Sequence, residues 1–324
     1  MKRTLGIGNA LVDVLTKVDN EQILSELHLP KGSMQLLSTE AYAEVTRRMQ
    51  ALPTKLTTGG SACNTLLALS QLDAPTGKIG NSGDDENGRF FASYFAQRGI
   101  STRLLHDRRP TGVASTFITP DGQRTFGTYL GAAARLTADE LQQAWFEGYD
   151  YFYIEGYLVQ NHDLVLRAIE LAHAAGCEVC LDLASYNIVE ADLDFFRALM
   201  PSIDIVFANE QEAQALTGLE ARAALDALAA TCHIAVVKIG KHGVWACHGT
   251  EVAHCQARDV PVVVDTTAAG DYFAAGFMHA LAAGEPLATC IARGSLLAGH
   301  IIEVVGTELP DATWQQLRLQ CGLA

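Results

Sequence analysis

The chain lacks any hydrophobic stretch long enough to cross a membrane as a helix. Such a span needs about 20 consecutive apolar residues, and polar side chains interrupt every apolar run of this 324-residue sequence before that length. The first eight residues also lack the apolar core and the cleavage site of a secretory leader. Low-complexity linkers and internal repeats are missing as well. We therefore expect a cytoplasmic protein.

Positive charge is scarce. Lys and Arg total 23 against 37 Asp and Glu, and the formal net charge at pH 7 is −14. Because nucleic-acid binding depends on basic patches, this balance argues against a DNA or RNA partner. A polyphosphate such as ATP would need local compensation from Mg²⁺, a helix N-terminus and a few basic side chains.

The sequence also lacks a complete metal-binding pattern. Among eight cysteines, Cys177 and Cys180 form a C-x-x-C pair, but no second pair completes a zinc site. The pair lies in a predicted strand, where an odd offset places the two side chains on opposite faces. The ten histidines form no H-x-x-x-H pattern. We interpret the cysteines as buried core residues.

What the sequence does contain is a regular alternation of short β-branched runs with amphipathic helices. The predicted strands are residues 4–7, 151–154, 178–183, 203–208 and 234–239. The predicted helices are residues 63–72, 88–98, 162–175, 193–200, 210–217 and 222–230. This order predicts an α/β fold with a doubly wound, mostly parallel sheet that binds ligands at the carboxyl ends of its strands.

Two regions depart from that alternation. Residues 11–38 hold two apolar runs around a polar helical stretch, and residues 112–132 predict a β-hairpin that turns at 120–122. Alternation along the second hairpin strand places Arg124, Phe126, Thr128 and Leu130 on one face. We expect the two regions to form a small β-rich lid on a single domain that spans residues 1–324, so that water is excluded from the mouth of the sheet.

The most informative segment is residues 262–273. Three valines, Val262 to Val264, predict a strand that ends in a tight turn, after which Ala269, Gly270 and Asp271 begin an apolar helix. The N–H groups at a helix start lack partners and the macrodipole is positive there, so the turn can hold an anion such as a transferring phosphoryl group. Asp271 is placed to accept a proton from a substrate hydroxyl. The alternative is that Asp271 only caps the helix.

Further polar groups follow other strands and glycines. Asn9 and Asp13 come after the first predicted strand, and a carboxylate there can accept bonds from both hydroxyls of a diol. An Asx-turn explains the same residues. Gly59 and Gly60 permit close approach of a ligand to the backbone and are followed by Asn64 in the first turn of a helix. Ordinary capping explains that string equally well.

Two more strings flank later strands. Asn209 and Glu212 share a helix face and can position hydrated Mg²⁺, although a capping box accounts for the same spacing. The segment containing Lys238, Gly240 and Gly243 offers charge and room for a nucleotide, or else is a hairpin turn.

Taken together, these motifs resemble those of the ribokinase-like (PfkB) carbohydrate kinases, and within that family the adenosine kinase branch. The resemblance runs from residue 4 to about residue 310 and implies a three-layer α/β/α domain with a β-rich lid that transfers the γ-phosphate of ATP. Residues 265–273 match the family signature D-T-x-G-A-G-D-x-F with one departure, Ala268 in place of Gly. The other supporting strings are residues 8–13, 59–61, 153–157, 209–212 and 305–310.

The resemblance also implies a role for each matching residue. Asp271 is the general base and Arg124 the lid arginine. The anion hole is Ala268, Ala269 and Gly270. The acceptor site comprises Asn9, Asp13, Gly59, Gly60, Asn64, Phe126, Leu130 and Tyr157. The ATP site comprises Asn209, Glu212, Lys238, Gly240, Gly243 and Thr266. A K⁺ ion beside the anion hole would be held by Asp265, Thr267 and Gly306, mostly through carbonyl oxygens.

The predicted function is thus ATP- and Mg²⁺-dependent phosphorylation of the 5′ hydroxyl of a ribonucleoside, with adenosine as the leading acceptor. The ungapped match places Met34 where adenosine kinases carry a Gln, so other nucleosides, ribose and fructose stay open as acceptors. A nucleoside-binding protein without activity is a further alternative. A nicotinamide-dependent dehydrogenase is disfavoured, because Leu11 stands where the third glycine of G-x-G-x-x-G belongs. We expect a monomer or a homodimer.

Overall fold

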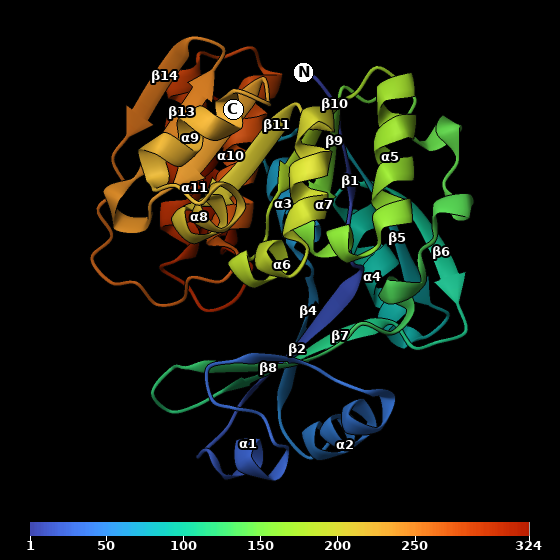
Figure 1. The fold of residues 1–324 in the computed structure, drawn as a ribbon. Coiled ribbons are helices and arrows are strands. Elements are labelled where there is room, and N and C mark those ends of the chain that lie inside the picture. The colour runs from blue at the N-terminus through green and yellow to red at the C-terminus, as the bar shows by residue number, and fades with distance from the viewer. Residues whose placement is uncertain (324) are drawn as a thin grey trace.

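The computed structural model describes residues 1–323, which form a large sheet of nine strands and a small sheet of five (Figure 1). The strand order of the large sheet is β14-β13-β12-β11-β10-β9-β1-β5-β6. All neighbours from β12 to β6 are parallel, and β13 and β14 add an antiparallel edge. The strands of the large sheet are β1 (Thr4–Ile7), β5 (Thr76–Gly83), β6 (Ser101–Asp107), β9 (Tyr151–Glu155), β10 (Glu178–Asp182), β11 (Ile205–Asn209), β12 (Ile234–Lys238), β13 (Val244–His248) and β14 (Glu251–Cys255).

Helices cover both faces of this sheet, which confirms the predicted three-layer α/β/α fold. On one face pack α3 (Ser61–Gln71), α4 (Glu86–Gln97), α10 (Ala269–Ala282), α11 (Leu287–Ile301) and α12 (Asp311–Gln320). On the other face pack α5 (His162–Ala174), α6 (Tyr186–Ala191), α7 (Leu193–Leu199), α8 (Glu210–Thr217) and α9 (Ala221–Ala229).

Each face of the large sheet packs against helices to form a hydrophobic core, and successive residues of a buried strand enter opposite cores. Tyr153 of β9 enters the core on the α10 side, and its neighbour Ile154 enters the core on the α5 side. Cys180 and Cys177 likewise lie in opposite cores, and both thiols are free and buried. The interpretation of this C-x-x-C pair as core cysteines is therefore confirmed.

The five predicted strands correspond to β1 and to β9 through β12, whereas β5, β6, β13 and β14 were not predicted and the expectation for residues 262–264 was wrong. These valines lie in an extended loop outside any sheet, with Val262 at 65% and Val263 at 55% exposure. The Val264 N–H donates to the carbonyl of Ile302, at the end of α11, instead of to a neighbouring strand. A β-branched run predicts a strand only where a sheet edge is available to pair with it.

The small sheet has the order β3-β8-β7-β2-β4 and lies below the large domain in Figure 1. Its strands are β2 (Leu11–Lys17), β3 (Met34–Leu36), β4 (Thr54–Gly59), β7 (Gly112–Ile118) and β8 (Arg124–Tyr129). Strands β7 and β8 form the predicted antiparallel hairpin. The sheet extends beyond the two predicted regions, because residues 39–59 add β4 and a helix.

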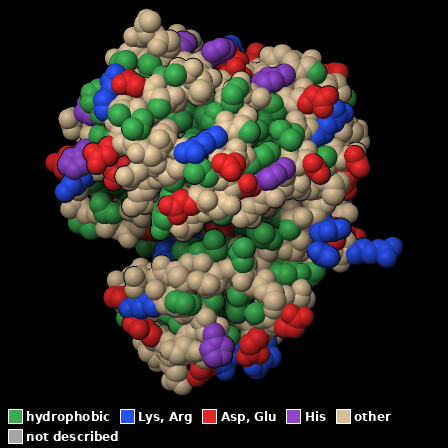
Figure 2. Space-filling view, viewed as in Figure 1, with side chains coloured by type: hydrophobic (Ala, Val, Ile, Leu, Met, Phe, Trp, Pro, Cys, Tyr) green, Lys and Arg blue, Asp and Glu red, His purple; other side chains and the backbone are tan. Residues whose placement is uncertain are grey.

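Two helices cover the outer face of the small sheet, α1 (Gln22–Glu26) and α2 (Thr39–Met49). Their apolar side chains form a separate small core around Phe117. The inner face is turned toward the large domain, and a groove separates the two parts on the face shown in Figure 2. Within residues 1–323, no helix combines the length and the apolar character that a membrane crossing requires.

Candidate active site

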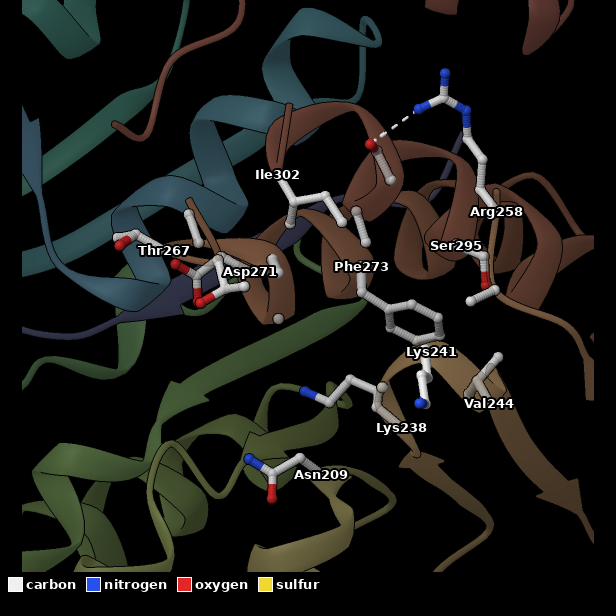
Figure 3. Close-up of a pocket in the computed structure, with 18 of the residues that line it drawn as sticks. Asn209, Lys238, Lys241, Val244, Arg258, Thr267, Asp271, Phe273, Ser295 and Ile302 are labelled. Carbon is white, nitrogen blue, oxygen red and sulfur yellow. Dashed lines mark hydrogen bonds between the residues drawn. The ribbon is translucent and has the colours of Figure 1, made fainter. Parts of the chain in front are cut away.

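The carboxyl ends of the parallel strands meet at one edge of the large sheet, where a cavity of about 890 Å³ opens (Figure 3). Strands β10, β11 and β12 each end in a polar residue that lines it: Asp182, Asn209 and Lys238. The turn before α10 forms another part of its wall. Of the predicted site residues, the cavity wall includes Tyr157, Asn209, Glu212, Lys238, Gly240, Gly243, Thr266, Thr267, Ala268, Ala269, Gly270 and Asp271.

The turn before α10 has the geometry of an anion site. Ala268 precedes the helix in the left-handed conformation, with φ +63° and ψ +6°. The N–H of Ala269 is already bonded to the carbonyl of Thr266 at 3.2 Å. The N–H groups of Gly270 and Asp271 therefore remain at the start of a 14-residue helix without an intrahelical partner. The predicted anion hole of Ala268, Ala269 and Gly270 is therefore revised: the N–H of Ala269 is already bonded, and the N–H of Asp271 joins that of Gly270 as an available donor.

We expect Ala268→Gly to raise the melting temperature. The left-handed conformation costs an L-residue about 1–2 kcal/mol, and part of that gain is offset because glycine has more freedom in the unfolded chain. The net stabilisation should be up to about 1 kcal/mol, or roughly 2 °C for a chain of this size. Calorimetric melting would measure it. Ala268→Val is the opposed control, since a β-branched residue at positive φ should lower the melting temperature.

Asp271 is held by two donors from the start of α3. Ser61 Oγ donates to Oδ1 at 2.6 Å, and Asn64 Nδ2 donates to Oδ2 at 2.8 Å. Burial raises the pKa of Asp271 to about 7, against the lowering effect of these two hydrogen bonds. Asn64, predicted in the acceptor site, thus orients the Asp271 carboxylate, and its buried Oδ1 has no protein partner. That atom remains able to accept a bond from a ligand.

Asp13 occupies the inner face of the small sheet. It lies on β2 directly opposite Thr57 of β4. A Cβ built on Gly59 would come within 2.1 Å of Asp13 Oδ1, so a glycine is required beside this carboxylate. Burial raises the pKa of Asp13 to about 7, while Arg124 lowers it and Glu308 raises it. Of the predicted apolar wall residues, Phe126 lies on β8 of the same sheet and Leu130 directly follows that strand.

Asn9 follows β1 and is fixed by a buried acid that the sequence analysis did not assign. Its Nδ2 donates to Glu155 Oε1 at 2.7 Å. Gly60, with φ +99°, packs so tightly that a Cβ there would lie 2.4 Å from the Asn9 carbonyl oxygen. The amide oxygen of Asn9 is therefore the atom left for an acceptor.

Arg124 connects the small sheet to the turn before α10. It forms an ion pair with Asp265 at 2.5 Å and donates to Thr267 Oγ1 at 3.0 Å, and both charged side chains are almost fully buried. Its buried Nε has no protein partner. Asp265 also accepts bonds from Thr267 and from the N–H of Gly306. Because these bonds occupy its carboxylate, Asp265 can contact a K⁺ ion only through its backbone carbonyl oxygen. The K⁺ site stays a prediction.

The structure bears out the local interpretation of two sequence strings, the capping box at 209–212 and the turn at 240–243. Asn209 and Glu212 form a capping box at the start of α8: the Glu212 N–H donates to Asn209 Oδ1 at 2.8 Å, and Asn209 N donates to Glu212 Oε2 at 2.7 Å. Gly240 and Gly243 lie in the turn between the antiparallel strands β12 and β13. All four residues line the cavity nevertheless, so these local roles do not remove them from the site.

Lys238 brings a positive charge to the turn. Burial alone would lower the pKa of Lys238, but Asp182, 3.3 Å away, and Glu212 raise it. Its Nζ lies 3.3 Å from the position of a Cβ on Gly270, and Figure 3 shows the side chain extending toward the end of the cavity where Asp271 lies. Burial raises the pKa of Glu212 to about 7. The cavity wall thus contains basic side chains, Lys241 and Arg258 as well as Lys238, beside the acids Asp182, Glu212 and Asp271.

Sequence reasoning missed three polar residues of the site: Ser61, Glu155 and Asp182. A signal for two of them was available, because Glu155 and Asp182 are acids at the carboxyl ends of fully buried parallel strands. A charge is rarely placed there without a partner. Within the described residues, no group of three or more His, Cys, Asp or Glu side chains is arranged to hold a metal ion.

Comparisons with known proteins agree with this geometry. The family model described as pfkB family carbohydrate kinase matches residues 36–314. Fructoselysine 6-kinase of Escherichia coli K12 is 28% identical over 78% of this chain and 92% of its own length. Adenosine kinase of Saccharomyces cerevisiae is 28% identical over 94% of this chain and 96% of its own. The crystal structure of adenosine kinase from Sinorhizobium meliloti superposes with a TM-score of 0.87, at 32% identity and 99% coverage of both chains.

Proposed function

We propose that this chain, which belongs to the pfkB family of carbohydrate kinases and is an alcohol-acceptor phosphotransferase, transfers the γ-phosphoryl group of ATP to the 5′ hydroxyl of a ribonucleoside, with adenosine as the preferred acceptor. The observation that carries the proposal is the position of Asp271. It lies in the first turn of α10, where its own N–H and that of Gly270 lack an intrahelical partner, is held by Ser61 and Asn64, and borders the cavity that contains Lys238.

In the proposed reaction Asp271 accepts the proton of the acceptor hydroxyl as its oxygen forms the bond to the γ-phosphorus. The bond from that phosphorus to the bridging oxygen of ADP breaks in line. The N–H groups of Gly270 and Asp271 and the guanidinium of Arg124 stabilise the charge on the transferring group. The oxygens of Asp182, Asn209 and Glu212 suit hydrated Mg²⁺, which would neutralise phosphate charge when bound. The small sheet acts as a lid that excludes water.

The acceptor site favours a nucleoside through its apolar surfaces. Phe126, Leu130 and Tyr157 offer walls for a purine, and Asp13 offers a carboxylate for the ribose diol. Adenosine kinases among the relatives agree with this assignment. Met34, on the edge strand β3 and 48% exposed, supplies no amide to read a ring atom. The second candidate is a free sugar or a sugar derivative, which the similarity to fructoselysine 6-kinase favours.

The test is acceptor-dependent conversion of ATP to ADP with Mg²⁺, with and without K⁺. The acceptor panel is adenosine, inosine, ribose, fructose and fructoselysine. The highest kcat/KM with adenosine is the expected result. A preference for a sugar would keep the proposed chemistry and replace the acceptor. A folded protein that binds adenosine without acceptor-dependent turnover would refute the proposed reaction.

The rate should depend on pH through two carboxylates. Burial raises the pKa of Asp271 to about 7 and that of Asp13 to about 7. Because Asp271 must be ionised to accept a proton, kcat at saturating acceptor should rise with pH and level off above about 7. The acceptor KM should fall over the same range as Asp13 ionises. Initial rates from pH 5 to 9 would show both changes, and a kcat that is flat down to pH 5 would contradict the role of Asp271.

A further inference from the structure

Two buried charges of opposite sign lie on either side of the Gly8–Asn9 segment. Glu155 ends β9 and Lys78 belongs to β5, and these are the two neighbours of β1 in the large sheet. Glu155 is 1% exposed and Lys78 is fully buried. Burying either charge is costly, so each one must be compensated by the groups that it contacts. Neither residue has a part in the proposed phosphoryl transfer.

Each charge holds backbone that carries site residues. Lys78 Nζ donates to the Gly8 carbonyl at 2.6 Å. Glu155 Oε1 accepts from Asn9 Nδ2 at 2.7 Å and from the Asn9 N–H at 3.4 Å. Its other oxygen, Oε2, accepts from the N–H of Ala62 at 3.1 Å. A Cβ on Gly8 would lie 2.5 Å from Oε2, so the carboxylate fits tightly against the chain.

The bond to Ala62 places Glu155 at the start of α3. Gly60 is the N-cap of that helix and has no side chain to cap it. Glu155 therefore supplies the capping carboxylate from a distant strand, where it also meets the positive end of the helix dipole. The same first turn contains Ser61 and Asn64, the two donors to Asp271. One carboxylate thus contacts both the segment that faces the acceptor and the turn that orients the base.

We infer that Glu155 and Lys78 are positioning residues that clamp the Gly8–Asn9 segment from both sides. The clamp fixes the position of Asn9 relative to the first turn of α3, which orients Asp271. The inference rests on the proposed phosphoryl transfer. The bond to Glu155 fixes the Asn9 side chain with its amide nitrogen toward Glu155 and its amide oxygen toward the acceptor. The bond from Ala62 to the same carboxylate fixes the distance between that oxygen and Asp271, which Ser61 and Asn64 hold.

The primary variant is Glu155→Gln, which keeps the shape. In either orientation, the NH₂ group of the new amide faces one of the donors, Asn9 or Ala62, from which Glu155 now accepts a hydrogen bond. We expect the acceptor KM to rise and kcat to fall, together reducing kcat/KM roughly 10- to 100-fold, since small displacements of a reacting group cost that much. The KM for ATP should change less than twofold. Lys78→Met, which removes only the donor to Gly8, should raise the acceptor KM in the same way.

The pH profile separates positioning from charge. Burial is the main cause that raises the pKa of Asp271; the hydrogen bonds from Ser61 and Asn64 lower it, and the charges of Asp182 and Glu155 raise it further. Lys238 is the cation that interacts with Asp271 across the cavity. If Glu155 acted only by its charge, Glu155→Gln would move the acidic limb of kcat to lower pH. If it also positions Ser61 and Asn64, their bonds weaken, and because each bond affects the pKa of Asp271 more than the Glu155 charge does, we expect a net shift of the limb to higher pH. A shift to lower pH would overturn the inference.

Two controls guard against a purely structural explanation. Asp204→Asn removes a carboxylate that accepts the N–H of Val179 at 2.7 Å, outside the site. We expect it to affect stability and to leave the acceptor KM and the pH limb unchanged. In a double-mutant cycle, Asn9→Ala and Glu155→Gln should have non-additive effects on the acceptor KM. Additive effects, or a lower melting temperature with an unchanged acceptor KM, would contradict the clamp.

A readout without turnover keeps this test separate from the proposed reaction. Amide hydrogen exchange at Asn9 and Ala62 should accelerate in Glu155→Gln, and calorimetric binding of adenosine without ATP should weaken. If the wild type binds adenosine without phosphorylating it, the proposed function fails while these two measurements still decide the clamp. Unchanged hydrogen exchange at both amides would refute the clamp.

Discussion

Asp271→Asn should abolish most turnover while leaving the fold intact. Removing a positioned base costs about 10²–10⁴-fold in rate, and Asn cannot accept the hydroxyl proton. The loss should appear in kcat, with the KM values for ATP and acceptor changed less than threefold, because the ligand contacts of Asp13, Arg124 and Lys238 are retained. Acceptor-dependent ADP release would measure it. Turnover within a few-fold of the wild type would exclude Asp271 as the base.

The stability of this variant is a useful control. The folded-state pKa of Asp271 is raised to about 7 from an ordinary value near 3.8, chiefly by burial. A carboxyl group with a raised pKa opposes folding once it must ionise, so its cost is fully present above pH 7. Asn removes that cost and loses one of the two hydrogen bonds from Ser61 and Asn64. At pH 8 the melting temperature should therefore stay within a few degrees of the wild type, which separates lost chemistry from lost folding.

Arg124→Met should lower kcat by about 10²–10³-fold, the usual consequence of removing one group that stabilises transition-state charge. The guanidinium is buried beside the turn that ends in Asp271, and its Nε is unpartnered. Arg124→Lys keeps the charge without the planar geometry and should recover part of the rate. Rapid-quench measurement of the phosphoryl-transfer step would test both variants.

Arg124 has a second possible role, since its ion pair with Asp265 ties the small sheet to the large domain. Asp265→Asn distinguishes the two roles because it weakens that tie and keeps the guanidinium. If Arg124 acts on the phosphoryl group, Asp265→Asn should lose far less rate than Arg124→Met. Equal losses in the two variants would mean that Arg124 serves only to hold the lid.

The large domain was predictable because its strands are short apolar runs in a regular alternation with helices, a pattern that local sequence determines. The valines at 262–264 show the limit of that reasoning. Propensity alone predicts a strand, whereas the available partner for Val264 is the end of α11. The strand at 54–59 was missed for the opposite reason: its polar, threonine-rich sequence becomes a strand only by pairing with β2.

The site was predictable where a residue lies in a compact motif. Asp271 and Asn209 follow a strand or a turn directly, so their location at the carboxyl edge follows from the fold class. The partners of these residues were not predictable. The contacts of Asp271 with Ser61, 210 residues away, and of Arg124 with Asp265, 141 residues away, depend on the packing of elements that no local pattern relates.

The connectivity of the two sheets has a consequence for biosynthesis. All five strands of the small sheet lie before residue 130, whereas β1, in the middle of the large sheet, receives its neighbour β9 only with residues 151–155. During translation the nascent chain can therefore complete the small sheet and the β1-β5-β6 portion while one side of β1 is still open. An unpaired edge strand that is buried in the folded protein is a site of association between chains. Until the ribosome has added β9, the open edge of β1 is thus a place where one nascent chain can associate with another, and each later strand from β9 to β12 takes over that edge in turn.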